Sequence, residues 1–255
     1  MKVKILGCYG SRVPGFSTSS LLINDTLLVD AGTVSSLLSQ EQQQGISDVL
    51  LTHAHLDHVV DLAFLIDNIM PSSRQPLRVW GPPPVLEDLH RFLFNNVLWP
   101  DFSRLPTPAA PAIELRPLPA APSCEIAGLR VQWERTAHPV HTVGYCLADA
   151  EGALLYSGDT TITEDLWTLG RSCPKLKLAL VETSFPNRLA DLAKASGHLT
   201  PAMLEGELAK FGRPEVPVRI FHMKPQFLAE IRSEVEALND PRLQLLQGGE
   251  EFQLS

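Results

Sequence analysis

The chain has few of the features that mark disulfide-rich or zinc-ribbon proteins. Its 255 residues include only four cysteines, and no two of them form a Cys-x-x-Cys pair. This spacing argues against a zinc ribbon, a redox dithiol and a disulfide framework. We therefore expect four buried free thiols, at Cys8, Cys124, Cys146 and Cys173.

Long apolar runs are also missing. No run approaches the roughly 20 residues that a helix needs to span a bilayer. The first residues, MKVKILG, form an apolar stretch too short for a signal peptide and are predicted to form a first strand. These observations predict a cytoplasmic protein with no membrane partner.

Positive charge is scarce. The chain has 21 Lys and Arg residues against 29 Asp and Glu residues, so its formal net charge is −8. Proteins that bind long nucleic acids without sequence preference depend on Lys and Arg to neutralise phosphates. We therefore expect no long nucleic acid as a partner.

What the sequence does contain is an alternation of apolar runs and helical patterns, bounded by turn residues, which is typical of α/β proteins. A single domain over residues 1–255 is expected. Between its halves lies a segment rich in Pro and Ala, residues 105–123, which is either a surface connection or a rim over the active site. Strands are predicted over 2–6, 20–23, 26–29, 48–52, 77–80, 129–134, 144–148, 153–156, 176–181 and 218–221. Helices are predicted over 34–43, 58–69, 85–97, 164–169, 201–210 and 226–238.

One pattern occurs twice. The stretch SLLINDTLLVDAGT, residues 20–33, is a strand, a turn and a strand that ends at Asp30. The stretch VGYCLADAEGALLYSGDT, residues 143–160, repeats this plan and ends at Asp159. Two similar halves with acidic residues at strand ends predict two sheets packed with their functional ends together.

The stretch THAHLDH, residues 52–58, follows a predicted strand and precedes a predicted helix. Loops at strand ends are where α/β folds place their chemistry. Neutral imidazole and carboxylate are good zinc ligands. The alternation of His53 and His55 lets two imidazoles converge, and Asp57 with His58 can face a second point, so the segment predicts a metal site.

This HxHxDH segment resembles the signature of the metallo-β-lactamase superfamily. The resemblance extends to LLVDAGT at Asp30, YSGDTT at Asp159 and IFHMKP at His222. In HPVHTVGY the matching histidine is His138, with His141 as the alternative. The resemblance implies a four-layer αββα sandwich in which two mixed β-sheets pack face to face with helices outside.

The same resemblance implies two divalent metal ions, with zinc expected and manganese as the alternative. The resemblance places Asp159 between the two ions and implies that Asp30 orients a ligand imidazole through a hydrogen bond. Two metals at this spacing lower the pKa of a bridging water and bind the oxygens of a phosphate. The implied ligands are His53, His55 and His138 for one ion, and Asp57, His58 and His222 for the other.

Two further segments favour a phosphodiesterase. ALVETSFPN places Glu182 after a strand, and SGHLTP places His198 before a helix. These stretches resemble ribonuclease Z and, most of all, the class II 3′,5′-cyclic nucleotide phosphodiesterases. The resemblance implies that His198 protonates the leaving oxygen, that Glu182 holds it, and that Asp57 also takes part in catalysis.

The expected activity is therefore hydrolysis of a small-molecule substrate, a 3′,5′-cyclic nucleotide, to its 5′-monophosphate by a hydroxide that bridges the metals. Three alternatives stay open: a ribonuclease Z-like enzyme that processes tRNA 3′ ends, a glyoxalase II-like thioesterase or lactonase, and a non-catalytic binding scaffold. The chain departs from the pattern at His141, where proline is usual. The resemblance also leaves room for a homodimer.

Overall fold

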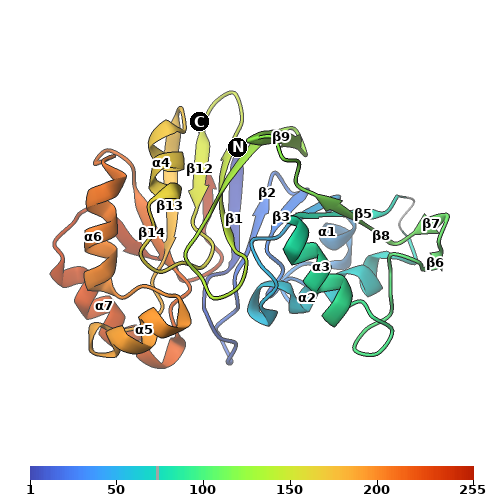
Figure 1. Ribbon diagram of the computed structural model, residues 1–255, viewed down its shortest axis with the longest axis horizontal. Helices are drawn as coiled ribbons and strands as arrows, with labels where there is room; N and C mark the ends of the chain where they lie inside the picture. Colours follow the sequence, from blue (N-terminus) through green and yellow to red (C-terminus); the bar gives the residue numbers. More distant parts are fainter. Residues whose placement is uncertain (73–74) are drawn as a thin grey trace.

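Two seven-stranded sheets form the centre of the molecule, a computed structural model that describes residues 1–72 and 75–255 (Figure 1). The first sheet has the order β16-β1-β2-β3-β4-β5-β8 and the second the order β15-β14-β13-β12-β11-β10-β9. The strands of the first are β1 (Lys2–Gly7), β2 (Ser20–Ile23), β3 (Leu27–Val29), β4 (Asp48–Leu50), β5 (Leu77–Gly81), β8 (Ile113–Pro117) and β16 (Glu251–Gln253). Those of the second are β9 (Ser123–Ile126), β10 (Leu129–Arg135), β11 (Val143–Ala148), β12 (Ala153–Tyr156), β13 (Leu176–Glu182), β14 (Val218–Phe221) and β15 (Leu243–Leu245).

Helices lie outside both sheets. Figure 1 shows α1, α2 and α3 beside the first sheet and α4, α6 and α7 beside the second, so the predicted four-layer αββα arrangement is confirmed. No helix in the described part of the chain is both long and apolar enough to cross a membrane. The α-helices are α1 (Gln40–Gln44), α2 (Leu56–Ile69), α3 (Pro83–Phe92), α4 (Asp165–Ser172), α5 (Ala190–Ser196), α6 (Pro201–Phe211) and α7 (Leu228–Ala237).

Strands β2 and β3 of the first sheet are buried on both faces. Successive side chains of a strand point to opposite faces. In β2, Leu21 and Ile23 therefore join the core between the sheets, whereas Leu22 joins the core beneath the helices. Burial on both sides explains why these strands are continuous apolar runs.

The parallel strands bring the functional ends of both sheets together. Strands β3, β4 and β5 are parallel neighbours in the first sheet, and β12, β13 and β14 in the second. Their carboxyl ends carry Asp30, the histidine-rich segment, Asp159, Glu182 and His222. This is the edge at which open α/β sheets bind ligands.

Two predicted helices are shorter than expected. The helix predicted over 34–43 begins only at Gln40, because Asp61 accepts hydrogen bonds from the backbone of Val34 and Ser35 while Ser39 caps the helix. The helix predicted over 85–97 ends at Phe92. There the Asn95 side chain accepts hydrogen bonds from the backbone amides of Val97 and Leu98, which favours a turn over a helix.

The Pro-rich segment 105–123 is neither a plain connection nor a rim. It contains the small hairpin of β6 (Pro106–Thr107) and β7 (Ala110–Pro111), followed by β8, which pairs in parallel with β5. Ile113 of β8 is buried in the core beneath the helices. Figure 1 shows the hairpin at the end of the molecule beyond β5, away from the strand ends described above.

The cysteine prediction is wrong for one pair. Cys146 and Cys173 form a disulfide, with their Cα atoms 6.8 Å apart. The pair is separated by 27 residues, but β11 and the end of α4 pack against each other, so the two thiols meet in the core. Cys8 and Cys124 are free, and Cys8 is buried as expected.

An ion pair between a buried carboxylate and a half-exposed arginine stabilises the first sheet. Asp48 is 1% exposed and accepts hydrogen bonds from Arg78 and Trp80 of the neighbouring strand. Burial opposes ionisation of Asp48, but these hydrogen bonds and the Arg78 charge hold its pKa below the usual value. Because the folded-state pKa is depressed, the pair stabilises the protein above the unfolded-state pKa and loses this contribution as pH falls through the folded-state pKa.

Asp48→Asn is therefore expected to lower the free energy of unfolding by about 2 kcal/mol at pH 7. The difference from wild type should shrink as pH falls below about 4, the ordinary Asp pKa. Urea unfolding at pH 7 and pH 3.5 measures both values. The exposed Asp25→Asn serves as control and should change stability by less than about 0.5 kcal/mol. An equal loss for Asp48→Asn at both pH values would contradict this account.

Candidate metal centre

The histidine-rich segment connects β4 to α2. Strand β4 ends at Leu50, and α2 begins at Leu56 with His55 as its N-cap residue. His53 therefore lies in the loop, and His58 lies in the first turn of the helix. Both imidazoles are completely buried, with 0% of the surface exposed. The predicted strand-loop-helix placement is confirmed.

Three other segments bring their side chains to the same place. His138 lies in the connection between β10 and β11, Asp159 follows β12, and His222 follows β14. His222 has a backbone φ of 65° and Asp30 one of 55°, both in the left-handed region. Such strain in a residue other than glycine is typical of functional sites.

The candidate ligand atoms form two adjoining groups, and a third group of Asp159, His198 and His222 overlaps both the cluster and its neighbour His198. Within each group the atoms lie within 4.8 Å of one another. Asp159 connects the groups, because its Oδ2 lies 3.5 Å from His53 Nε2 and its Oδ1 lies 3.4 Å from His58 Nε2. His222 Nε2 lies 3.4 Å from Asp159 Oδ2. The first group is His53, His55, His138 and Asp159, and the second is Asp57, His58 and His222.

Hydrogen-bond contacts at Nδ1 orient four imidazoles of the cluster. His53 Nδ1 lies 2.9 Å from Thr52 Oγ1, and His58 Nδ1 lies 2.8 Å from Asp30 Oδ2. The same pattern holds for His138 with the Gly197 carbonyl and for His222 with the Ser184 hydroxyl, each at 2.9 Å. Outer hydrogen bonds of this kind orient metal-binding histidines, and here they direct Nε2 inward.

Inward-facing atoms of the cluster are left without hydrogen-bond partners. Among the described residues, His53 Nε2, His58 Nε2 and Asp159 Oδ1 are buried and make no hydrogen bond. An unpartnered buried polar group is costly. A cation bound between these nitrogen and oxygen atoms would satisfy all three, and the donor set is the one that zinc prefers. The cluster therefore fits a divalent metal site.

The electrostatics of the cluster also suit a cation. Burial, reinforced by neighbouring histidines, lowers the pKa of His53, His55 and His138. These imidazoles are therefore neutral and can bind a metal ion through a lone pair. Burial opposes ionisation of Asp159, but the adjacent histidines hold its pKa well below the usual value. At neutral pH the centre is therefore anionic at Asp159.

Glu182 and His198 lie beside this cluster. Glu182 ends β13, and His198 Nδ1 lies 2.8 Å from Glu182 Oε1. The His198 ring stacks on His222, with ring centroids 5.1 Å apart. Burial opposes protonation of His198, but the Glu182 carboxylate raises its pKa above the ordinary value. The pair is therefore suited to carry a proton next to the candidate metal ligands.

Several residues that hold the candidate ligands in place are not indicated by any sequence motif. Ser184 donates to Glu182 Oε2 at 3.0 Å and also contacts His222. Tyr156 donates to Asp30 Oδ2 at 3.1 Å across the two sheets. A Cβ at Gly10 would lie 2.7 Å from His222 Nδ1, so only glycine fits there. In the sequence, these residues stand out only because Tyr156 is close to Asp159 and Ser184 is close to Glu182.

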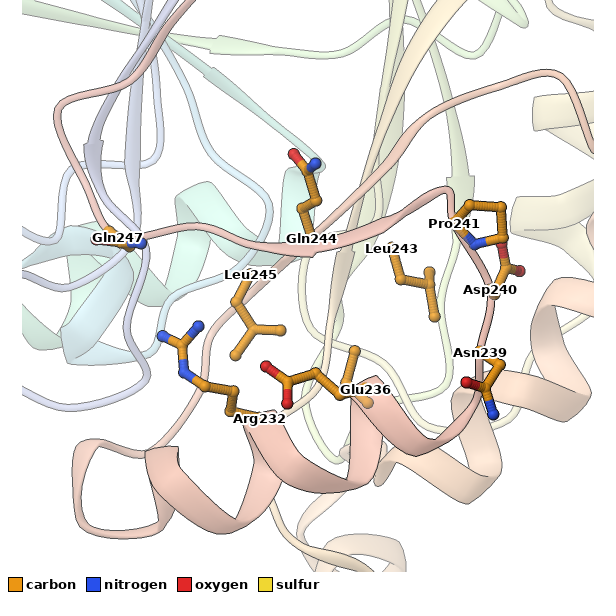
Figure 2. A pocket seen from close by; sticks show the side chains of 10 residues that line it. Arg232, Glu236, Asn239, Asp240, Pro241, Leu243, Gln244, Leu245 and Gln247 are labelled. Carbon is orange, nitrogen blue, oxygen red and sulfur yellow. The ribbon is translucent and has the colours of Figure 1, made fainter.

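The structure separates the two candidates in HPVHTVGY. His138 lies among the cluster residues, with its Nε2 3.2 Å from His55 Nδ1. His141 instead lines a cavity of about 340 Å³ that adjoins His55. A second cavity of about 570 Å³ lies between α7 and β15 (Figure 2), and none of its lining residues belongs to the histidine cluster.

Comparison with known proteins assigns the chain to a family. The family described as "Beta-lactamase superfamily domain" matches residues 25–237. The chain is 25% identical over 239 residues to 3′,5′-cyclic-nucleotide phosphodiesterase 1 of Saccharomyces cerevisiae, a match covering 80% of this chain and 61% of the yeast protein. It is 29% identical over 209 residues to ribonuclease Z of Mycobacterium sp. (strain KMS), covering 76% of this chain and 72% of that protein.

A solved structure shows the same fold. The metallo-beta-lactamase fold protein YhfI of Bacillus subtilis superimposes with a TM-score of 0.80 at 17% sequence identity, over 99% of each chain. The fold, the His/Asp cluster and the family match agree with the resemblance seen in the sequence. The chain belongs to the beta-lactamase superfamily domain family and has the metallo-beta-lactamase fold.

Proposed function

We propose that this protein hydrolyses 3′,5′-cyclic nucleotides to 5′-monophosphates with the help of two zinc ions. The first ion would be held by His53, His55 and His138, the second by Asp57, His58 and His222, and Asp159 would contact both. When bound, the two cations supply a nucleophilic water of lowered pKa and stabilise charge on the phosphate. The unpartnered inward-facing atoms described above support this assignment.

The observation that carries the proposal is the Glu182–His198 pair beside the cluster. Hydrolysis of a phosphodiester releases an alkoxide, which leaves poorly unless it receives a proton. His198 is positioned to supply that proton, and Glu182 orients the ring and stabilises its charged form. A thioester releases a thiolate, which is a better leaving group than an alkoxide, and so needs such a pair less. The names of the yeast and mycobacterial relatives, both of which cleave phosphodiesters, add support.

Ribonuclease Z-like processing of tRNA is the second candidate because of the mycobacterial relative. The formal charge of −8 argues against it, since tRNA binding depends on Lys and Arg contacts to phosphates. No basic insertion in the sequence provides such contacts. We therefore favour a small, compact substrate.

A substrate panel tests the proposal. The zinc-loaded protein should hydrolyse cyclic AMP or cyclic GMP with a kcat/KM at least about a hundredfold above that for a lactone or a glutathione thioester, the scale of one general acid. Precursor tRNA should not be cleaved at a specific site. Manganese-loaded protein, run in parallel, compares the two expected metals. Preference for the lactone, the thioester or precursor tRNA would refute the cyclic nucleotide assignment.

A further inference from the structure

A cavity of about 340 Å³ opens directly beside the candidate metal centre. It lies between the start of α2, the end of α3 and the loop that follows His138. His55 belongs both to its wall and to the metal cluster. A molecule that presents a phosphate to the cluster can therefore extend its other end into this cavity. Its volume lies within the range of about 300–1,000 Å³ that small-molecule sites occupy.

The cavity walls are apolar, and much of their apolar surface faces water. Leu56, Phe92 and Leu98 line the cavity and are 63%, 58% and 60% exposed. Three of the ten large apolar side chains that are exposed in the described part of the chain therefore line this one cavity. A contiguous apolar surface of this kind marks a binding site. A flat aromatic ring would cover these side chains at little entropic cost.

Besides His55, two polar side chains, Asp88 and His141, interrupt the apolar wall. Both side chains are half-buried in the cavity wall, where a ligand in the cavity can reach them. An ionised carboxylate only accepts hydrogen bonds, so a ligand that satisfies Asp88 must carry a donor. A hydrocarbon chain has none, and a phosphate would be repelled. An aromatic base with an exocyclic amine has both the flat apolar face and the donor.

We propose that this cavity binds the purine base of the substrate, with the Asp88 carboxylate accepting a hydrogen bond from the exocyclic amine. The base lies against Phe92 and Leu98, and His141 closes the side nearest to the metal centre. This inference rests on the proposed function and extends it, because it names the group that selects the substrate. It makes Asp88 and Phe92 specificity-determining residues.

Binding of two reaction-product analogues tests the base site without turnover. Calorimetric titration of the zinc-loaded protein should show that AMP binds at least tenfold more tightly than ribose 5-phosphate, which lacks the base. Phe92→Ala should weaken AMP binding about fivefold to tenfold and leave ribose 5-phosphate unchanged. The matched control is Leu192→Ala, an exposed apolar residue of α5 outside the cavity, which should alter neither affinity.

The amine contact has its own test. Asp88→Ala should weaken AMP binding at least fivefold but leave unchanged the binding of purine riboside 5′-monophosphate, which lacks the amine. Equal affinities for AMP and ribose 5-phosphate in the wild type, or equal losses for both in Phe92→Ala, would overturn the base site. Hydrolysis of cyclic AMP is measured alongside. Turnover without the affinity pattern refutes only the base site, whereas the affinity pattern without turnover refutes the proposed phosphodiesterase and keeps the cavity as a nucleotide site.

Discussion

Asp159→Ala is expected to reduce hydrolysis of cyclic AMP by on the order of a thousandfold and to lower the metal content of the purified protein. The residue is 1% exposed, and its two oxygens face three imidazoles, which come from the loop after β4, the first turn of α2 and the residue after β14. Without this carboxylate, no described anionic group connects the two ligand groups. A loss of several kcal/mol of charge stabilisation corresponds to this fall in rate.

Elemental analysis and steady-state kinetics on the same preparation measure both effects. Asp159→Asn keeps the volume of the side chain and separates loss of charge from the creation of a cavity. Asp191→Ala, on the exposed face of α5, is the matched control and should keep full activity and metal content. If Asp159→Ala retained two metal ions per chain and normal turnover, the proposed bridging position would be wrong.

The sequence predicts most of the sheet because strand signals are local. Apolar runs such as β2 and β12 have the predicted bounds, since both faces of each strand are buried and turn residues flank them. Elements that depend on tertiary contacts escaped prediction. Strand β8 lies in a Pro-rich segment and forms because Ile113 packs beneath the helices beside β5. Strands β15 and β16 are short edge strands without a strong apolar pattern.

The candidate metal centre was predictable to the extent that its residues lie in short motifs. The four candidate ligands of the histidine-rich segment lie within residues 53–58, in the loop after β4 and the first turn of α2, so their spacing alone indicates a metal site. His138 and His222 are distant in sequence, and only the family resemblance selected them. The hydrogen bonds that orient them come from the Gly197 carbonyl and from Ser184. A backbone carbonyl has no sequence signature, so this layer of the site required coordinates.

The disulfide between Cys146 and Cys173 could not be predicted from the sequence either. Spacing rules exclude local Cys-x-x-Cys pairs but carry no information about cysteines brought together by packing. Cys146 lies on β11, and Cys173 follows α4, which packs on the same sheet. Only the strand order and helix placement make this proximity visible.

His198→Ala is expected to separate substrates by their leaving groups. Hydrolysis of cyclic AMP, whose leaving group is an alkoxide, should fall about a hundredfold to a thousandfold, the usual contribution of a general acid. Hydrolysis of bis-p-nitrophenyl phosphate should fall less than about fivefold, because nitrophenolate leaves without a proton. The metal content should stay unchanged, because the cluster retains His222 and Asp159 when the His198 ring is removed.

The difference between the two substrates shows whether His198 donates a proton or only supports the His222 ring. The His198 ring stacks on His222, so a purely structural role would disturb that candidate ligand and slow both substrates equally. Glu182→Gln provides the second measurement, since it keeps a hydrogen-bond acceptor near His198 Nδ1 but removes the charge that raises the His198 pKa. It should slow cyclic AMP hydrolysis more than nitrophenyl ester hydrolysis. Parallel losses on both substrates in both variants would show that the pair positions the metal centre and donates no proton.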